Sequence, residues 1–519
     1  MDDNVLNLLK KGEKGIKSII FSRMLIIIIL FVIHVLVLFS IFEWFAQFIP
    51  HVFGTSIVFI VIMVIYLINS NMNSSAKITW LVLIMISPIF GSLLYFYTIS
   101  ELGYKTIKKR LSDILDMTSL KLRQDDKVLD KLKKKDKNIA SLVHYVNTTG
   151  CYPVFDNTDV TYFPLGENKL EMLLAKLKEA KEFIFLEYFI IEEGKMWGSI
   201  LNILAQKVKE GVEVRVMYDG TCELSTLPHN YPSRLEKLGI KCKMFAPLTP
   251  FVSTYYNYRD HRKILVIDNK YAFNGGVNLA DEYINVKQKH GHWKDTAIML
   301  EGSAVRSFTL MFLQMWNVNE KTMEFDKYLL SQYQCPSCGF VMPFGDYPLD
   351  NEKVGQNVYI DILNSANDYV YIMSPYLILD DEMKNALKFA SKRGVDVRII
   401  LPGIPDKIAP YALAKTHYKA LLDANVKIYE YTPGFVHAKI FVSDNIKAVV
   451  GTINLDYRSL YHHFECGTFL YDVSCISNII EDYHLTLEKC HRVTYDDIKK
   501  EKLSMKAMGM LLKAIAPLM

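Results

Sequence analysis

The residues that could do chemistry occur in two copies of one pattern, His-x-Lys-x-x-x-x-Asp followed by Gly-x-x-Asn. The first copy consists of His261, Lys263, Asp268, Gly275 and Asn278. The second copy consists of His437, Lys439, Asp444, Gly451 and Asn454. Every member of the second copy lies 176 residues after its counterpart, as 437 − 261 and 454 − 278 show. The matched offsets indicate an internal duplication, and the duplicated part carries the reactive residue types.

Each copy offers an imidazole beside an ammonium group. Apolar residues follow both lysines, at 264–267 and 440–442, and predict a buried β-strand in each copy. Side chains alternate between the faces of a strand, so the histidine and the lysine two residues later point the same way. The downstream glycines permit close approach of the backbone to a ligand, and the asparagines can donate amide hydrogens to it.

Two imidazoles, two ammonium groups and two amides suit a phosphodiester. Its negative charge spreads over the non-bridging oxygens as phosphorus is attacked, and fixed donors stabilise that charge. One histidine can attack phosphorus while the other protonates the leaving alkoxide. We expect this chemistry to need no metal and no cofactor. A lone His-x-Lys is usually an ordinary feature of a strand, but the longer pattern and its repetition favour catalysis.

The two intact motifs resemble those of the phospholipase D superfamily, in which two such motifs pair across a pseudo-twofold axis into one active site. The resemblance implies an α/β fold of mixed sheets, duplicated into two halves that each consist of a sheet and helices. It also implies that His261 is the nucleophile and His437 the general acid. The implied phosphate-binding and supporting residues are Lys263, Lys439, Asn278, Asn454, Gly275, Gly451 and Thr452. Gly276 is the counterpart of Thr452 and lacks the hydroxyl that is frequent at this position.

The resemblance assigns roles to acidic residues as well. The motif aspartates, Asp268 and Asp444, are expected to support the geometry of the site without touching phosphate. In the family, an acidic residue after each motif orients an active-site histidine, and Asp295 and Glu465 are the candidates here, with ordinary surface charges as the alternative. Glu187 is a weaker candidate, because a proline replaces it in the second half.

The composition bounds the function. The chain has 519 residues, of which half are hydrophobic, and a formal net charge of +4. So small a charge gives no global case for nucleic-acid binding. The eight cysteines show no paired spacing except Cys335 and Cys338, and a zinc ribbon needs a second pair nearby. We interpret this pair as a loop feature, with a redox or metal role as the alternative.

Apolar residues concentrate near the N-terminus, in segments at 24–42, 53–68 and 78–99. The first is long enough to cross a bilayer, the second is near the minimum, and the third contains Pro88, which membrane helices tolerate. We expect two or three transmembrane segments and no cleaved signal peptide, with buried helices of a soluble domain as the alternative. The run 77–95 is similar to the N-terminal membrane module of bacterial cardiolipin synthases.

A basic stretch follows the apolar segments. Residues 105–137 include twelve Lys or Arg against six Asp. By the positive-inside rule, this flank and the basic N-terminus are both cytoplasmic, which requires an even number of spans although three apolar segments are present. The number of spans and the sidedness stay open, and we expect the catalytic part on the cytoplasmic side. The stretch is either a solvated linker helix or an attractor of anionic lipid.

The remaining chain divides into two similar halves. In the first, strands at 183–191 and 212–219 flank a helix at 198–210, which argues for a sheet covered by helices. Strands at 369–376 and 395–401 repeat this plan. The expected parts are a membrane module, a basic linker, the first half, a connector, the second half and an amphipathic tail, at 1–102, 103–142, 143–330, 331–357, 358–497 and 498–519. The tail is expected to pack on the domain, with a membrane-surface helix as the alternative.

The resemblance extends over nearly the whole chain and implies a bacterial cardiolipin synthase, a multi-pass protein of the cytoplasmic membrane. Such an enzyme transfers a phosphatidyl group between two phosphatidylglycerol molecules through a phosphohistidine and releases glycerol. Exchange of one phosphodiester for another is close to energy-neutral, and no phosphate-loop signature for a nucleotide is present. Anchoring in anionic lipid would concentrate the acceptor. The alternatives are a phospholipase D hydrolase, a transphosphatidylase that uses another alcohol, a nuclease and a non-catalytic scaffold; no protein partner is indicated.

Overall fold

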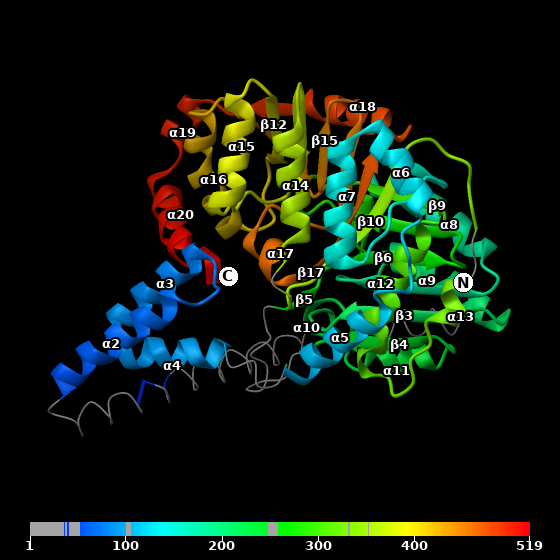
Figure 1. Ribbon diagram of the computed structural model, residues 1–519, viewed down its shortest axis with the longest axis horizontal. Coiled ribbons are helices and arrows are strands. Elements are labelled where there is room, and N and C mark those ends of the chain that lie inside the picture. The colour runs from blue at the N-terminus through cyan, green and yellow to red at the C-terminus, as the bar shows by residue number, and fades with distance from the viewer. Residues whose placement is uncertain are drawn as a thin grey trace.

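The computed structural model describes residues 52–99, 105–247, 258–330, 333–350 and 352–518, together with Leu36, Phe39 and Ser40. The predicted apolar segment 24–42 therefore lies almost entirely outside the described residues. Two large β-sheets with their helices form the main body of the molecule, and three helices from the N-terminal region project from it (Figure 1).

The first sheet has seven strands in the order β1-β9-β7-β6-β2-β3-β4. They are β1 (Thr158–Phe163), β2 (Phe183–Tyr188), β3 (Glu213–Asp219), β4 (Lys241–Phe245), β6 (Lys263–Ile267), β7 (Tyr271–Gly275) and β9 (Ala297–Gly302). Every residue of β2 and of β6 is buried, as their nearly continuous apolar runs predict for strands covered on both faces. The accompanying helices are α8 (Gly166–Glu179), α9 (Lys195–Lys209), α10 (Cys222–Ser225), α11 (Tyr231–Glu236), η2 (Asp281–Ile284), α12 (Val305–Trp316), η3 (Asn317–Asn319) and α13 (Asp326–Leu329).

The second sheet has nine strands, eight of them in the order β10-β17-β16-β15-β11-β12-β13-β18. These eight are β10 (Phe340–Asp346), β11 (Tyr369–Met373), β12 (Asp396–Pro402), β13 (Lys427–Tyr431), β15 (Ile440–Ser443), β16 (Lys447–Gly451), β17 (His463–Tyr471) and β18 (Cys490–Arg492). The accompanying helices are α14 (Val354–Ser365), α15 (Asp381–Lys392), α16 (Ile408–Leu422), α17 (Tyr457–Tyr461), α18 (Ile476–Leu487) and α19 (Tyr495–Lys500).

The two halves repeat one strand plan. In the first, β2 runs parallel to β3 and antiparallel to β6, which contains the first motif lysine. In the second, β11 runs parallel to β12 and antiparallel to β15, which follows the second motif lysine. This repetition confirms the predicted duplication of a mixed α/β fold.

Two short strand pairs join the halves at their centre. The ninth strand of the second sheet, β5 (Arg259–Asp260), comes from the first half and runs parallel to the start of β17. In the same way β8 (His292–Lys294) of the first half pairs with β14 (Gly434–Val436) of the second. Each pair ends beside a motif histidine, so the contact between the halves and the candidate site are formed by the same segments.

The N-terminal helices are α2 (Val52–Ile68), α3 (Ser74–Ile86) and α4 (Pro88–Ile99). The apolar segment 78–99 belongs to two helices rather than one, because α3 ends at Ile86 and α4 starts at Pro88, with Ser87 between them. A proline disfavours helical geometry in the residue before it. Within the described ranges, no helix combines the length and apolar character that a bilayer crossing requires.

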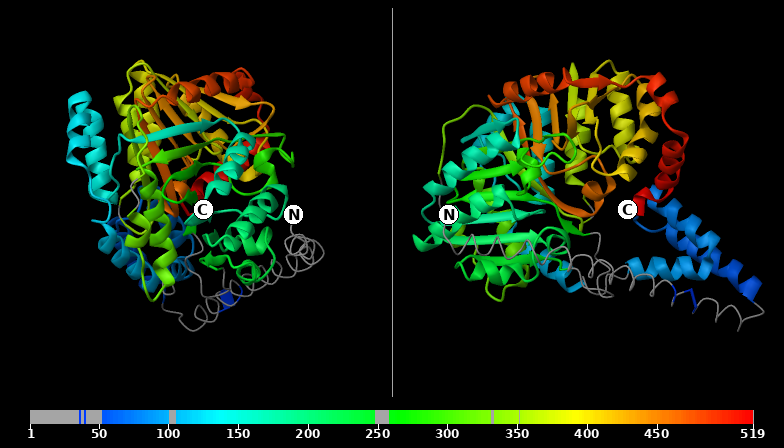
Figure 2. Two further views of the ribbon diagram at one scale, coloured as in Figure 1. Left: turned by 90° about the vertical axis from the view of Figure 1, so that its right-hand side faces the viewer. Right: turned by 180° about the vertical axis from the view of Figure 1, so that it is seen from behind.

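The basic linker and the tail are both helical. The linker forms α5 (Lys105–Thr118) and α6 (Asp126–Lys135) and continues into α7 (Lys137–Gly150), which packs against α14. The tail forms α20 (Leu503–Ile515) and η4 (Ala516–Leu518). In Figures 1 and 2 α20 lies at the edge of the second half, close to α3, so that the C-terminal helix contacts one of the N-terminal helices.

Candidate active site

Both motif histidines lie between strands rather than within one. His261 follows β5, and Lys263 is the first residue of β6; His437 follows β14, and β15 begins one residue after Lys439. The prediction that histidine and lysine share a single strand was therefore wrong. In the first motif the chain leaves the β5–β17 pair at His261 and then forms β6 of the first sheet. In the second motif it leaves the β14–β8 pair at His437 and then forms β15 of the second sheet. The lysines still fold back on the motif, because each Nζ donates a hydrogen bond to the carbonyl oxygen of its own histidine.

Each histidine is paired with a carboxylate from the other half. His261 Nδ1 lies 2.8 and 3.0 Å from the two carboxylate oxygens of Glu465. His437 Nδ1 lies 2.6 Å from Asp295 Oδ2. Both carboxylates are fully buried, and the histidines are 6% and 8% exposed. The structure thus places Asp295 and Glu465 as partners of the histidines, in a crossed arrangement that sequence reasoning did not anticipate.

The crossing follows from the two strand pairs between the halves. The β8–β14 pair ends at Lys294 and Val436, and the backbone N–H of His437 donates to the Lys294 carbonyl at 2.7 Å. Asp295 is the next residue and is thereby brought to the ring of His437. The backbone N–H of His261 likewise donates to the Phe464 carbonyl at 3.0 Å, and the next residue is the carboxylate partner of His261.

The carboxylates determine which ring nitrogen faces a substrate. Asp295 and the ammonium of Lys439 both approach His437 Nδ1, at 2.6 and 2.9 Å. An ammonium has only hydrogens to donate, whereas a carboxylate accepts, so the two contacts require opposite states of this nitrogen. The shorter contact to the fully buried carboxylate assigns the proton to Nδ1, and Nε2 is left for a substrate. The contacts of Glu465 likewise assign the proton of His261 to Nδ1 and leave its Nε2 for a substrate.

Burial dominates the electrostatics of the site. It lowers the pKa of His261 well below its usual value, and the Lys263 and Lys439 ammonium groups lower that pKa further. Burial, followed by Lys439, lowers the pKa of His437 to about 4, although Asp295 opposes the shift. Burial also lowers the pKa of Lys263 to about 8 and that of Lys439 to about 7. A bound phosphate anion would favour the protonated form of all these groups.

The motif aspartates lie at the far ends of their strands. The Asp268 carboxylate accepts hydrogen bonds from the backbone N–H groups of residues 181–183, at 2.7 to 2.9 Å. The Asp444 carboxylate accepts from those of residues 367–369, at 2.9 to 3.0 Å. Both aspartates have a positive φ, of 52° and 53°. Each aspartate therefore ties the turn after its motif strand to the start of the adjacent strand, β2 or β11. This arrangement accords with a supporting role.

The other predicted phosphate-binding residues are buried near the motifs, and two of them, Asn278 and Thr452, have protein partners of their own. Asn278 donates to the Tyr283 hydroxyl at 2.8 Å and accepts from the backbone N–H of Ile190 at 3.0 Å. One of its two amide hydrogens is therefore committed to tyrosine. Asn454 is 4% exposed. The Thr452 hydroxyl donates to Glu465, so it orients the partner of His261 instead of providing a contact to phosphate.

The glycines explain a difference between the halves. A Cβ on Gly276 would lie 2.0 Å from Asp295 Oδ1, so no threonine like Thr452 fits there. The backbone N–H of Thr296 donates to that oxygen at 2.8 Å instead. Gly275 and Gly451 each lie against a backbone carbonyl, at 2.5 Å from their Cβ positions, which leaves no room for a side chain.

Sequence reasoning missed two aromatic residues. Trp293 and His463 each stand two residues before a crossed carboxylate. Their rings lie against the histidine of the opposite half, with centroids 5.4 Å apart for Trp293–His437 and 5.3 Å for His463–His261. Their common position before an acidic residue is the signal that could have identified them.

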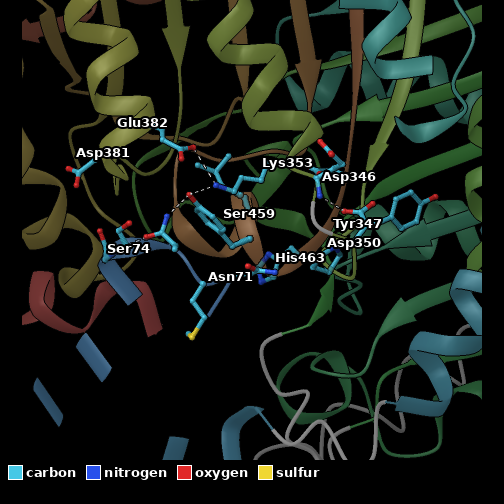
Figure 3. A pocket seen from close by; sticks show the side chains of 17 residues that line it. Asn71, Ser74, Asp346, Tyr347, Asp350, Lys353, Asp381, Glu382, Ser459 and His463 are labelled. Atoms are coloured by element: carbon cyan, nitrogen blue, oxygen red, sulfur yellow. Dashed lines mark hydrogen bonds and ion pairs between the residues drawn. The ribbon is translucent and has the colours of Figure 1, made fainter. Parts of the chain in front are cut away.

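His463 differs from its counterpart in its chemistry and its surroundings. It borders a cavity of about 570 Å³ between the α2–α3 loop and the second half, whose other lining residues include Asn71, Ser74, Lys353 and Glu382 (Figure 3). Burial lowers the pKa of His463 to about 3, so the ring is neutral. Neither ring nitrogen has a hydrogen-bond partner among the described residues, and Glu465 Oε1 lies 3.7 Å from Nδ1.

Three further predictions concern metals, thiols and Glu187. Within the described part of the chain, the buried group His261, His463 and Glu465 has ligand atoms close enough to hold a metal ion, but His261 and Thr452 already bind the Glu465 carboxylate. The CxxC cysteines are free thiols in the stretch before β10. The weaker candidate, Glu187, forms a fully buried ion pair with Arg262 at 2.9 Å and is not the partner of a motif histidine.

Comparison with known proteins adds independent findings. Residues 173–316 and 359–486 match the family described as "Cardiolipin synthase, PLD-like domain", and residues 58–98 match "Phospholipase D-nuclease N-terminal". The chain is 31% identical to cardiolipin synthase 2 of Bacillus cereus, over 86% of this chain and 88% of that protein. It is also 31% identical to the cardiolipin synthase of Alkalihalophilus pseudofirmus, over 92% and 95%. An uncharacterised protein of Streptococcus mutans is 59% identical, over 88% and 99%.

Among solved structures, the fold is similar to that of phosphatidylserine synthase from Haemophilus influenzae. The TM-score is 0.56, and the match covers 74% of this chain and 98% of that one. At 13% sequence identity this similarity concerns the fold alone.

Proposed function

The chain belongs to the phospholipase D-like cardiolipin synthase family, and from this membership we propose that it converts two phosphatidylglycerol molecules into cardiolipin and glycerol. The observation that carries the proposal is the pair of crossed dyads, His261–Glu465 and His437–Asp295. Each holds an imidazole by Nδ1 and leaves Nε2 for the substrate. Two such imidazoles in one site are what a double displacement at phosphorus needs.

In the first displacement, His261 Nε2 attacks the phosphorus of the donor lipid. A bond from nitrogen to phosphorus forms, and the bond from phosphorus to the glycerol oxygen breaks. Protonated His437 gives its proton to that oxygen, and glycerol leaves. The negative donor phosphate favours the imidazolium form of His437, whose pKa in the empty site is held low by burial first and by Lys439 second. The ammonium groups of Lys263 and Lys439 stabilise charge on the non-bridging oxygens.

In the second displacement, a glycerol hydroxyl of the acceptor lipid gives its proton to neutral His437 and attacks phosphorus. The bond to His261 breaks, cardiolipin forms, and both histidines return to their starting states. Asp295 and Glu465 keep the rings in place and stabilise each positive imidazolium as it forms. Asp268 and Asp444 hold the motif strands, and Asn278 and Asn454 line the phosphate position.

The membrane location is part of the proposal. The N-terminal helices expose many large apolar side chains, among them Ile62, Ile65, Ile78, Met85 and Ile86. Together with the apolar segment 24–42 they would anchor the enzyme in the bacterial cytoplasmic membrane, with the catalytic halves on the cytoplasmic side. The basic linker, which forms α5 and α6, would face anionic headgroups. A membrane-bound enzyme meets its acceptor at high local concentration, which favours transfer over hydrolysis.

A product assay tests the reaction. The full-length protein in vesicles would be given phosphatidylglycerol without nucleotide, and cardiolipin, glycerol and phosphatidic acid would be quantified. Cardiolipin and glycerol in equal amounts are expected. Phosphatidic acid with little cardiolipin would instead support the second candidate, a hydrolase, which would use the same dyads with water as acceptor.

Matched variants test the residues. His261→Ala and His437→Ala should each lower turnover about a thousandfold or more. His229→Ala removes an exposed histidine that pairs with Glu223 and should leave turnover unchanged. Lys263→Arg should also be severely impaired, since a planar guanidinium does not replace a compact ammonium in a fully buried position. Substantial turnover by either alanine variant would contradict the paired mechanism.

A further inference from the structure

The C-terminal helix α20 packs on the second catalytic half along one face. Gly509 lies against α16 so closely that a Cβ would stand 2.5 Å from the Ala412 carbonyl oxygen. Leu512 packs on a small cluster formed by Leu413, Tyr457 and Ala516. This face therefore has its partner within the chain, as the sequence predicted for the tail.

The opposite face of α20 is apolar too and is exposed. Leu503, Met510 and Leu511 are 81%, 63% and 74% exposed, and Ala507 and Ala514 are exposed as well. Their spacing places all five on one side of the helix. The helix α20 is thus apolar on two opposite sides, with Lys506 and Lys513 between them, and a second apolar side of this kind normally has a partner in protein or in lipid. The outer face of α20 therefore requires an apolar partner.

The position of α20 indicates which partner this is. The Thr79 hydroxyl on α3 donates to the Ala514 carbonyl at 2.8 Å. Leu518, just after α20, packs on the core of the N-terminal helices, which contains Leu67 and Trp80. On α3 itself Ile78, Val82, Met85 and Ile86 are exposed. Figures 1 and 2 show α20 beside α3, so two helices with exposed apolar side chains lie next to each other.

The charges around α20 favour an anionic bilayer over a protein partner. Exposed lysines precede the helix at positions 499, 500 and 502, and Lys513 is exposed near its end. Lysines beside an apolar stripe place their stems along the lipid and their ammonium groups among headgroup phosphates. Lysine is, by contrast, depleted in protein–protein interfaces.

We propose that α20 is an in-plane membrane helix, with Leu503, Met510 and Leu511 inserted among the acyl chains of an anionic bilayer. This rests on the membrane location included in the proposed function. Because α20 packs on α16 of the second half, its insertion would fix the height and tilt of the catalytic halves over the lipid surface. The enzyme would then be bound at two places, by its N-terminal segments and by α20.

Depth-dependent quenching tests this inference. The full-length protein would carry Cys338→Ser, since Cys338 is exposed, and Leu511→Cys labelled with a fluorophore; the same parent without Leu511→Cys gives the background. It would be reconstituted in phosphatidylglycerol vesicles that contain lipids with a nitroxide on the acyl chain. The matched control is a label at Leu485→Cys on α18, which is 52% exposed and lies far from α20 (Figure 1). We expect several-fold stronger quenching at position 511, and about a twofold or greater reduction when Leu503→Gln and Met510→Gln are added.

The outcomes are separable. Equal quenching at positions 511 and 485 in protein that floats with the vesicles would overturn the inference and leave the membrane location intact. A label at 511 that is shielded from water but not quenched by lipid would mean that a protein covers the helix, which also overturns it. Failure of the protein to float would refute the membrane location itself.

Discussion

Asp295→Asn should impair the enzyme through a histidine of the other half. Asp295 Oδ2 lies 2.6 Å from His437 Nδ1, and the carboxylate is fully buried. Asparagine has the same shape and its oxygen can still accept from the Thr296 backbone N–H, now at 2.8 Å from Oδ1. The substitution therefore removes the negative charge and the strong acceptor with little change of packing.

The size of the effect follows from this contact. A hydrogen bond to a charged group contributes about 1.5–3 kcal/mol. Since about 1.4 kcal/mol corresponds to a tenfold change in rate, kcat/KM for cardiolipin formation should fall about tenfold to a hundredfold. Asp295 also opposes the burial and the Lys439 charge that lower the pKa of His437 to about 4. Without the carboxylate the pKa of His437 falls further, so His437 loses the proton that it needs as general acid at a lower pH.

The assay is the pH dependence of kcat/KM in phosphatidylglycerol vesicles. The limb on which activity falls with rising pH reports the loss of the acid's proton, and it should move to lower pH in Asp295→Asn. Asp482→Asn is the matched control, because Asp482 binds Lys294, the neighbour of Asp295, at 2.7 Å and is not the partner of His437.

Three results would refute this reasoning. One is activity in Asp295→Asn within about twofold of the wild type. Another is a shift of the limb to higher pH, which would mean that the carboxylate destabilises the imidazolium. The third is an equal loss and an equal shift in Asp482→Asn, which would point to general damage at β8 rather than to the dyad.

Three further changes test other contacts. Thr452→Val removes the hydroxyl that donates to Glu465 and should lower kcat/KM about fivefold to tenfold; an unchanged value would contradict the orienting role. Asp268→Asn and Asp444→Asn weaken three backbone hydrogen bonds each; each should lower the free energy of unfolding by about 1–2 kcal/mol, seen as a lower Tm, while folded protein keeps its turnover. Burial lowers the pKa of His417 to about 3, so its contribution to stability is present above its unfolded pKa of about 6.5 and is lost as pH falls. His417→Leu should therefore remove about 2 kcal/mol of the stability lost between about pH 7 and pH 5 in thermal melts, and equal acid sensitivity of both proteins would exclude this group.

Local patterns in the sequence were enough to predict the duplication and several buried strands of the fold. The constant offset between the motifs identified the duplication, because a repeated segment keeps its spacing when it forms the same strands. The apolar runs at 183–191 and 369–376 predicted β2 and β11, since residues buried on both faces need no polar alternation. The apolar character of 78–99 did not reveal that the segment is divided between two helices, because the division depends on a single residue, the one before Pro88, whose helical geometry the proline disfavours.

The sequence by itself determined which residues can do chemistry, because each motif is a short stretch of chain whose spacing can be recognised without knowledge of the fold. Only the tertiary structure decided how they are paired. Asp295 is 142 residues from His437 and Glu465 is 204 residues from His261. These contacts arise where β8 meets β14 and β5 meets β17. Pairing between strands so far apart depends on how the two sheets dock, which no local pattern encodes, and the same docking brings Trp293 and His463 against the histidines.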